Sequence, residues 1–340
     1  MRTVTKDTVT AASREDMMKH RFVGFAAIAA MAIGLMSGAF AQDAKPNFKV
    51  TLLGTGTPPP LMNRFGPATL VQVGGKTILF DAGRGATQRM WQIKVPFGKL
   101  DALILTHLHS DHVVGIPDIW LTGWLRGPYG RRDNPLRILG PAGTEDMVTH
   151  LQAAYAWDVN TRVEDQKMSR EAAGIAATDI APGVVFEADG VTITAFANNH
   201  GELIDPSLGY RIDYDGRSVV ISGDTKRVQS LVDAARGVDL LIHSIGAAKP
   251  ELLATAPIWR AIMAHHIEPE DAGRVFTETA PKMAAFTHVV ALTNDKIPPV
   301  GAEEIMQRTR TTYDGPLTMG QDLMAFVISA DGVETVPHMK

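Results

Sequence analysis

Short apolar runs that end in Gly, Pro, Asp or His recur along the chain from residue 48 onward. The segment 48–60, FKVTLLGTGTPPP, alternates apolar and polar positions as a half-buried strand does, and it runs into a Gly/Pro turn. Within 68–83, two apolar runs joined by Gly74-Gly75 predict a β-hairpin. The run at 100–107, LDALILTH, is continuous and short, which is typical of a strand buried on both faces.

The second half of the chain repeats these runs with helical segments between them. Apolar runs that end in His or Asp lie at 190–200, 209–224, 237–244 and 281–288. Helical stretches are expected at 85–95, 227–237 and 269–280. Hairpins followed by strand–helix alternation predict two mixed β-sheets with helices on the outside.

The first 41 residues have the layout of a secretory signal peptide. A basic stretch, Lys19-His20-Arg21, precedes the apolar segment 22–37, and Ala39-Phe40-Ala41 forms an A-x-A cleavage site. We expect cleavage after Ala41 and a periplasmic or secreted protein with a single domain at 42–340. The apolar part is short for a membrane span, so no stable membrane anchor is expected after cleavage; an uncleaved anchor is the alternative. The start is left open between Met1 and Met17 or Met18.

Composition narrows the chemistry and the partners. The chain has 340 residues and no cysteine, so any metal site must draw its ligands from His, Asp and Glu. The predicted leader carries five basic and three acidic residues, which leaves 28 basic and 34 acidic residues and a formal charge of −6. A net acidic surface repels a polyanion, so no nucleic acid is expected as a partner. The oligomeric state is left open, with a homodimer among the candidates.

The run at 105–115, LTHLHSDHVVG, carries most of the candidate chemistry and holds three of the chain's 11 histidines. His107 and His109 are two positions apart in extended chain, so they point the same way and can grip one cation. Asp111 and His112 then turn at the start of a helix and can reach a second cation. Imidazole and carboxylate ligands suit zinc among the available divalent metals.

Further ligand-type residues follow other apolar runs. Side chains at the carboxyl ends of strands face a crevice rather than the core, and they gather residues that are distant in sequence. The residues in such positions are His107, His200, Asp224, His243 and His288.

The segment THLHSDHVVG resembles the signature of the metallo-β-lactamase superfamily. The further motifs LLGTGTP, DAG, GYRI and ISGDTK extend the similarity over most of 48–290 and resemble the ribonuclease Z and arylsulfatase-like branch. This resemblance implies an α/β (α+β) fold, a four-layer αββα sandwich of two mixed β-sheets with outer helices. It also implies a metal-dependent hydrolase.

The resemblance further implies a site for two Zn²⁺ ions per chain, with other divalent metals left open. The implied ligands are His107, His109 and His200 for the first ion, Asp111, His112 and His288 for the second, and Asp224 as a bridge. Asp81 would orient a ligand histidine from behind. His243 is the other candidate for a supporting role, although its surroundings, LIHSIG, depart from the His-Glu-Ala of the branch.

Two residues are candidates for catalysis beyond metal binding. Asp111 could hold the proton of the nucleophile, and His266, in AHHIEPEDAG, matches a histidine that contacts the scissile group in the branch. Its neighbour His265 is left without a role. A water shared by two ions becomes hydroxide at neutral pH, so we expect an exported hydrolase of a small-molecule ester, an aryl sulfate, a phosphodiester or similar.

Other functions remain as alternatives. A ribonuclease Z-type tRNA 3′-end endonuclease is disfavoured by the predicted leader and by the short interval between His200 and Asp224, where tRNA-processing members carry a long arm. A lactonase or β-lactamase-type hydrolase would use the same metal chemistry. A di-iron redox protein is disfavoured because His109 stands where those relatives have Glu. A non-catalytic metal-binding module is disfavoured because every ligand position is filled.

Overall fold

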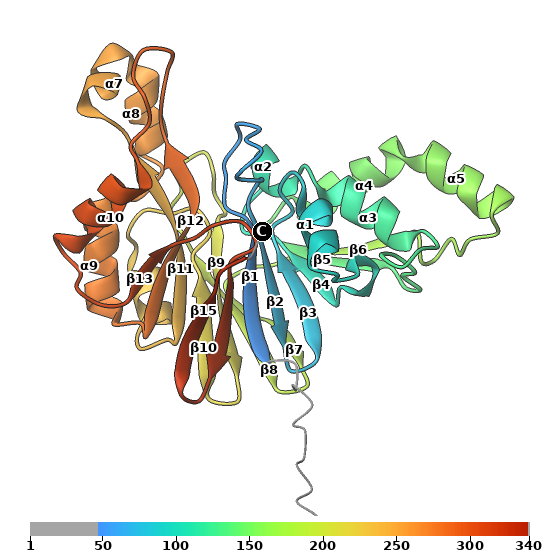
Figure 1. Cartoon of the computed structure of the whole chain (residues 1–340). Helices are drawn as coiled ribbons and strands as arrows, with labels where there is room; N and C mark the ends of the chain where they lie inside the picture. The colour runs from blue at the N-terminus through green and yellow to red at the C-terminus, as the bar shows by residue number, and fades with distance from the viewer. Residues whose placement is uncertain (1–46, 339–340) are drawn as a thin grey trace, which may run out of the picture. The chain divides into compact units, whose positions relative to one another are not determined.

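The computed structural model describes residues 47–338 (Figure 1), and the predicted signal peptide lies outside them. The strands of the first sheet are β1 (Phe48–Gly54), β2 (Ala68–Val73), β3 (Lys76–Phe80), β4 (Ala102–Ile104), β5 (Leu136–Gly140), β6 (Ile175–Asp179), β14 (Ala325–Ser329) and β15 (Gly332–Val336). Those of the second are β7 (Gly183–Ala188), β8 (Val191–Ala197), β9 (Leu208–Tyr214), β10 (Arg217–Ile221), β11 (Leu240–Ala247), β12 (Met283–Ala291) and β13 (Leu317–Met319).

The helices connect these strands and flank them. They are α1 (Ala86–Gln92), the 3-10 helix η1 (Phe97–Lys99), α2 (Ser110–Val113), α3 (Ile116–Trp124), α4 (Thr144–Ala154), α5 (Ala156–Asp165), α6 (Gln229–Ala235), α7 (Pro250–Thr255), α8 (Pro257–Met263), α9 (Pro269–Thr279) and α10 (Ala302–Arg310). The helices expected at 85–95, 227–237 and 269–280 are confirmed as α1, α6 and α9. No helix within 47–338 is long and apolar enough to cross a membrane.

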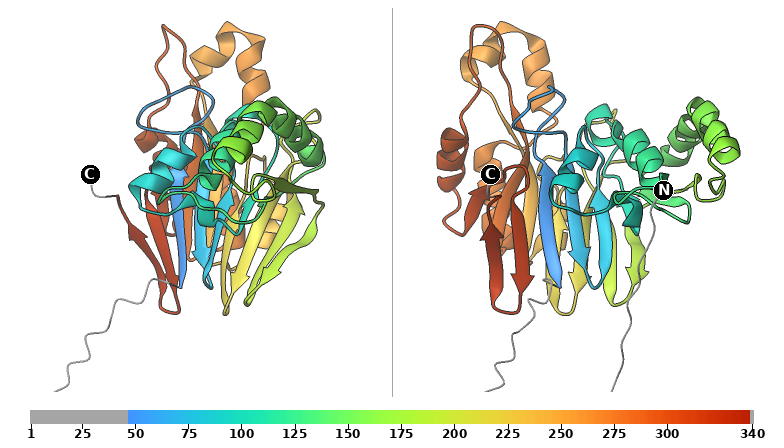
Figure 2. Two further views of the ribbon diagram at one scale, coloured as in Figure 1. Left: turned by 90° about the vertical axis from the view of Figure 1, so that its right-hand side faces the viewer. Right: turned by 45° about the vertical axis from the view of Figure 1, so that its right-hand side comes forward.

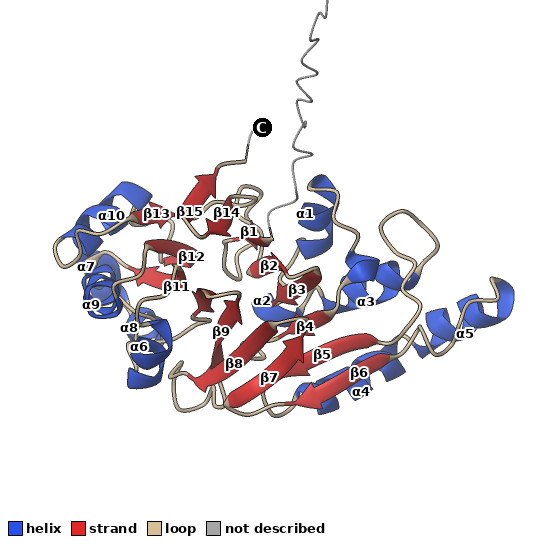
Figure 3. Ribbon diagram, turned by 90° about the horizontal axis from the view of Figure 1, so that it is seen from below, coloured by secondary structure: helices blue, strands red, loops and turns tan. Residues whose placement is uncertain are grey.

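Both sheets are mixed. The first has eight strands in the order β15-β14-β1-β2-β3-β4-β5-β6, and the second has seven in the order β13-β12-β11-β10-β9-β8-β7. In the first sheet β1, β2 and β3 pair antiparallel, and β3 to β6 pair parallel. In the second, β7 to β10 are antiparallel, and β10 to β13 are parallel. Seen from below in Figure 3, helices lie on both flanks of the strands, so the predicted sandwich of two mixed sheets with outer helices is confirmed.

Three apolar clusters hold these layers together. The cluster between the sheets includes Leu52, Ile212 and Phe326. A second cluster packs α1 and α3 onto the first sheet, and a third packs α6, α9 and α10 onto the second. Because each sheet is covered on both faces, its strands read as nearly continuous apolar runs, and polar side chains collect where the strands end.

The strand ends that matter most share one edge of the sandwich. β4, β8, β10 and β12 each run into, or contain, one of the predicted ligands. Above this edge, in the views of Figures 1 and 2, stand the α7–α8 pair on one side and α4–α5 on the other. The fold thereby gathers residues from positions 107 to 288 in one place.

Candidate metal centre

The predicted ligands converge. Among the described residues, four overlapping groups of three have ligand atoms within 4.8 Å of one another: His107-His109-His200, His107-His112-Asp224, Asp111-His112-His288 and His200-Asp224-His266. All seven predicted ligands belong to these groups, together with the candidate catalytic residue His266. The cluster is buried except for His109 and His266, which are partly exposed.

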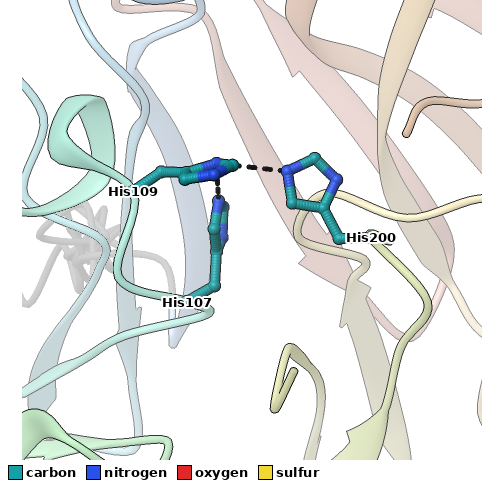
Figure 4. A group of neighbouring side chains, drawn as sticks. All are labelled: His107, His109 and His200. Atoms are coloured by element: carbon teal, nitrogen blue, oxygen red, sulfur yellow. Dashed lines mark hydrogen bonds between the residues drawn. The ribbon is translucent and has the colours of Figure 1, made fainter. Parts of the chain in front are cut away.

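Three histidines form one end of the cluster. The His109 Nδ1 atom lies 3.0 Å from His107 Nε2 and 3.2 Å from His200 Nε2, and Figure 4 shows the three rings turned toward one another. Burial lowers the pKa of each of these imidazoles, that of His107 most strongly. Neutral imidazoles at pH 7 offer lone pairs to a cation, so this end fits the predicted first metal site.

Asp111, His112 and His288 form the other end. His288 Nε2 lies 3.2 Å from Asp111 Oδ2, and His112 Nε2 lies 3.8 Å from the same oxygen. His288 is the extra residue of a β-bulge, because Ser244 pairs with Thr287 whereas the next residue of β11 pairs with Val289. Its φ of 43° is rare for a residue with a side chain. The bulge therefore aims the His288 ring at the cluster.

Asp224 lies between the two ends. Its Oδ2 atom is 3.7 Å from His200 Nε2, 3.6 Å from His112 Nε2 and 3.3 Å from His288 Nε2. Burial works against ionisation of Asp224, but the nearby His288 and His112 outweigh it and hold the pKa of the carboxyl well below its usual range. An ionised carboxylate that faces histidines of both ends is the geometry expected of a bridging ligand.

An unpaired buried atom supports the fit to cations. The Nε2 atom of His112 is buried and has no hydrogen-bond partner within the described chain. Burial opposes protonation of His112, yet the carboxylates of Asp81 and Asp224 raise its pKa well above its usual range. This ring therefore sits where the surrounding charge favours a cation. The donor set of imidazole and carboxylate fits divalent metals such as zinc.

Asp81 supports both ends from behind. It accepts hydrogen bonds from His112 Nδ1 at 2.8 Å and from the Thr106 hydroxyl at 2.9 Å. The Thr106 oxygen in turn lies 3.0 Å from His107 Nδ1. Asp81 thus fixes His112 directly and His107 through Thr106, with Nε2 of each ring left for the cluster. This role of Thr106 was not predicted from the sequence. The position of Thr106 directly before His107 was the only sequence feature that pointed to it.

His200 has a support of its own. Its Nδ1 donates to the backbone carbonyl of His265 at 3.0 Å, which leaves His200 Nε2 for the cluster. No role for His265 was predicted from the sequence. In the structure, its backbone carbonyl orients the His200 ring. A backbone acceptor carries no residue-type signal, so no reading of the sequence could have found it.

His266 lies beside the cluster, whereas His243 faces elsewhere. The His266 ring is 5.2 Å from that of His200 and 5.8 Å from that of His288, and burial lowers its pKa to about 4. His243 is fully buried, lies edge-on to Phe276 at 6.1 Å, and places Nδ1 2.7 Å from the Ser244 carbonyl. It makes no hydrogen bond to a predicted ligand in the described residues, so its supporting role stays a prediction.

Several known proteins are similar to this chain in sequence. The model of the β-lactamase superfamily domain matches residues 76–289, more than half of the chain. Ribonuclease Z from Mycolicibacterium gilvum (strain PYR-GCK) is 32% identical over 277 residues, which cover 81% of this chain and 94% of that protein. Ribonuclease Z from Mycobacterium avium (strain 104) is 35% identical over 244 residues, which cover 71% and 86%.

Solved structures show the same fold at lower identity. The metallo-β-lactamase fold protein YhfI from Bacillus subtilis superposes with a TM-score of 0.63 at 20% identity, covering 82% of this chain and 98% of its own. The short form of human tRNase Z has a TM-score of 0.58 at 21% identity, with coverage of 82% and 98%.

The names of these relatives correct one prediction. A small-molecule ester substrate, with no nucleic acid as a partner, was expected from the net acidic charge, the predicted leader and the short interval between His200 and Asp224. Relatives that are 32% and 35% identical over most of their length are ribonucleases by name, so this expectation is wrong. The physical reason is that net charge describes the whole surface, whereas substrate recognition depends on the local surface around the site.

Proposed function

Because the chain belongs to the metallo-β-lactamase superfamily, as a metal-dependent hydrolase of the ribonuclease Z branch, we propose that it hydrolyses phosphodiester bonds in RNA. The observation that carries this proposal is the position of the Asp224 carboxylate between two groups of histidines, which fits a pair of divalent cations, two Zn²⁺ per chain in the simplest case. Paired metal sites of this kind recur in phosphatases and nucleases.

The proposed ligands are those predicted from the sequence. His107, His109 and His200 would hold one cation, Asp111, His112 and His288 the other, and Asp224 both. Two cations bound there would supply positive charge for the phosphoryl oxygens and would lower the pKa of a water between them. The chain itself supplies geometry, because Asp81, Thr106 and the His265 carbonyl fix ring orientations before any substrate arrives.

Asp111 would accept a proton from the attacking water, and His266 would donate a hydrogen bond to a phosphoryl or leaving oxygen. Asp111 is buried, and burial opposes ionisation of its carboxyl, but the adjacent His288 and His112 together lower the pKa of this group. An ionised Asp111 can accept a proton from the attacking water. His266 is neutral near pH 7, since its pKa is about 4. We therefore assign His266 the role of a neutral hydrogen-bond donor to a phosphoryl or leaving oxygen, rather than that of a proton source.

The test uses protein that begins at Gln42, loaded with Zn²⁺, on three substrates: a tRNA precursor with a 3′ trailer, an unstructured RNA oligonucleotide and DNA of the same sequence. We expect RNA cleavage that chelation with EDTA removes and Zn²⁺ restores. Cleavage of the tRNA precursor alone would specify the ribonuclease Z-type endonuclease. A zinc-loaded protein that leaves all RNA intact contradicts the proposal.

Localisation stays a prediction. The leader at 1–41 would place this hydrolase in the periplasm or outside the cell, and it lies outside the described residues. Fractionation of cells that express the full chain, with mass spectrometry of the mature N-terminus, tests both export and the cleavage after Ala41.

A further inference from the structure

Among the four buried ligand histidines, one differs from the others in how its distal nitrogen is satisfied. His107, His112, His200 and His288 all direct Nε2 at the cluster. Nδ1 of the first three meets the Thr106 hydroxyl, the Asp81 carboxylate and the His265 carbonyl, respectively. His288 Nδ1 is buried and has no hydrogen-bond partner anywhere in 47–338. A metal-ligating imidazole almost always donates its second N–H, so this nitrogen calls for an acceptor.

Two more buried atoms without partners belong to residues close by. They are Asp224 Oδ1 and Ser244 Oγ, on side chains that are 2% and 1% exposed. Ser244 pairs with Thr287 across β11 and β12, directly before the bulge at His288. Three unpaired polar atoms on neighbouring buried residues carry a large desolvation cost if nothing satisfies them.

The three residues line one small cavity. Its walls include Asp81, His112, Asp224, Ser244, Thr287 and His288, and its volume is about 20 Å³. One water needs roughly 10–15 Å³ of such space and two to four polar partners. The cavity therefore has room for a single water, and three of the residues that line it carry a buried polar atom without a partner.

We propose that this cavity holds one structural water, and that Ser244 is a positioning residue for the metal centre. The water accepts the Nδ1–H of His288, donates to Asp224 Oδ1 and exchanges its remaining hydrogen bond with the Ser244 hydroxyl. It thereby fixes the His288 ring with Nε2 toward the cluster and holds the free oxygen of the bridging carboxylate. The role that Asp81 plays for His112 is performed at His288 by Ser244 and the water.

Zinc affinity tests the inference, which rests on the proposed metal centre. Ser244→Val should fill the cavity and displace the water, so the zinc dissociation constant, measured by competition with a chromogenic chelator, should rise by about 10–100-fold. Ser244→Ala leaves room for the water and two of its partners, and it should weaken zinc binding less than Ser244→Val. The matched control is Thr51→Val, because Thr51 Oγ1 is also buried and unpaired but Thr51 does not line the cavity. Zinc affinity of the control should equal that of the wild type.

Zinc affinity of Ser244→Val equal to that of the wild type would overturn the inference. A crystal structure of the wild-type protein gives a second readout that needs neither a stable variant nor activity. A water within hydrogen-bond distance of His288 Nδ1 and Asp224 Oδ1 supports the proposal, and a dry cavity or a flipped His288 ring refutes it. Because the cavity is lined by protein atoms alone, this readout stands even if the wild type binds no zinc, a result that would count against the proposed function instead.

Discussion

The first sheet delivers four of the seven predicted ligands from one six-residue stretch, His107 to His112, whereas the second delivers His200, Asp224 and His288 separately, from β8, β10 and β12. The contiguous group needs only a strand end and one turn of helix α2 to take its shape. The separate group needs the correct register of the five adjacent strands from β8 to β12. Local geometry therefore builds one part of the centre, and the completed fold builds the other.

The supports behind the ligands differ in the same way. In the first sheet a single carboxylate, Asp81, orients His112 directly and His107 through Thr106. In the second sheet His200 relies on a backbone carbonyl, and His288 relies on the water that we propose beside Ser244. Substitution of the supporting residue in the first sheet should therefore disturb two ligands at once. Substitution of a supporting residue in the second sheet should disturb a single ligand. Asp224 is the exception in the second sheet, because it is itself a ligand that faces both ends of the cluster.

Asp224→Ala should have the largest effect, because this residue joins the two groups. Removing the carboxylate leaves the imidazoles of both ends without their shared anion, so we expect loss of most bound zinc and a fall in RNA cleavage on the order of 10³-fold or more. Metal content after gel filtration, read by mass spectrometry, and cleavage rate check this prediction.

The matched control for Asp224→Ala is Asp239→Ala. Asp239 is also a buried carboxylate of the second sheet, 4% exposed, but it pairs with Lys282 at 2.7 Å and belongs to none of the ligand groups. This control should lose stability and keep its zinc. Full metal content in Asp224→Ala would show that the two groups do not depend on a shared ligand.

His266→Ala should cause the second-largest fall in the rate of RNA cleavage. This variant should lower turnover without changing the amount of bound zinc. Six imidazole and carboxylate ligands besides the bridge remain in place, so zinc content should stay at the wild-type level, while turnover falls by roughly 10²-fold for want of a hydrogen-bond donor. His265→Ala is the neighbouring control, because its backbone carbonyl still accepts from His200. Zinc loss in His266→Ala, with full zinc content in His265→Ala, would place His266 among the ligands.

The pH dependence gives the same residue a second test. Because the pKa of His266 is lowered to about 4 by burial, its ring is neutral throughout the range from pH 6 to 8. Removal of His266 should therefore lower the rate at all pH values in that range by the same factor. A rate ratio that changes tenfold per pH unit would mean that His266 acts as a proton donor.

Asp81→Asn should have a smaller effect on activity, although Asp81 supports ligands at both ends of the cluster. The amide keeps an acceptor oxygen for one partner but loses the charge that favours a cation at His112, so zinc affinity should fall by about 10–100-fold. Asp101→Asn is the control in the same sheet, since Asp101 accepts from the Thr77 backbone at 2.8 Å and is exposed. If Asp81→Asn weakens the binding of only one zinc ion, the hydrogen-bond path from Asp81 through Thr106 does not help to orient His107.

The sequence predicted the candidate ligands of both sheets, but it did not predict the features that depend on how the strands of the second sheet pair. The stretch at 107–112 was recognisable because its spacing is local, and His200, Asp224 and His288 were recognisable because each follows an apolar run. The bulge that turns His288 inward was not visible, because it depends on how β11 and β12 pair. Nor was the cavity beside Ser244, whose walls come from six separate segments. The substrate was predicted wrongly, because net charge does not describe the surface near the site.

Asp322→Asn should have the smallest effect on activity, because this nearly buried carboxylate belongs to neither group of ligands. The Asp322 carboxylate accepts from the Thr55 backbone at 2.9 Å, from Phe65 N at 2.7 Å and from Arg89 at 2.9 Å, across more than 230 residues of chain. It thereby anchors both ends of the loop 55–65, whose Thr55 carbonyl accepts from the backbone of Val289, next to His288. This contact spans too much sequence to be predicted from any local pattern.

An anchored loop shapes substrate binding more than metal binding, because all seven ligands remain. Replacing one Asp322 oxygen with an amide nitrogen removes two of the four hydrogen bonds that the carboxylate accepts. This loss costs about 1–2 kcal/mol, so we expect KM for RNA to rise by roughly 5- to 30-fold, with zinc content unchanged and kcat within about twofold of the wild type. Asp331→Asn, an exposed carboxylate of the same C-terminal segment, should change neither constant. If Asp322→Asn lowers zinc content instead, the loop holds His288 in place through Val289, and the second sheet would depend on the first for one of its own ligands.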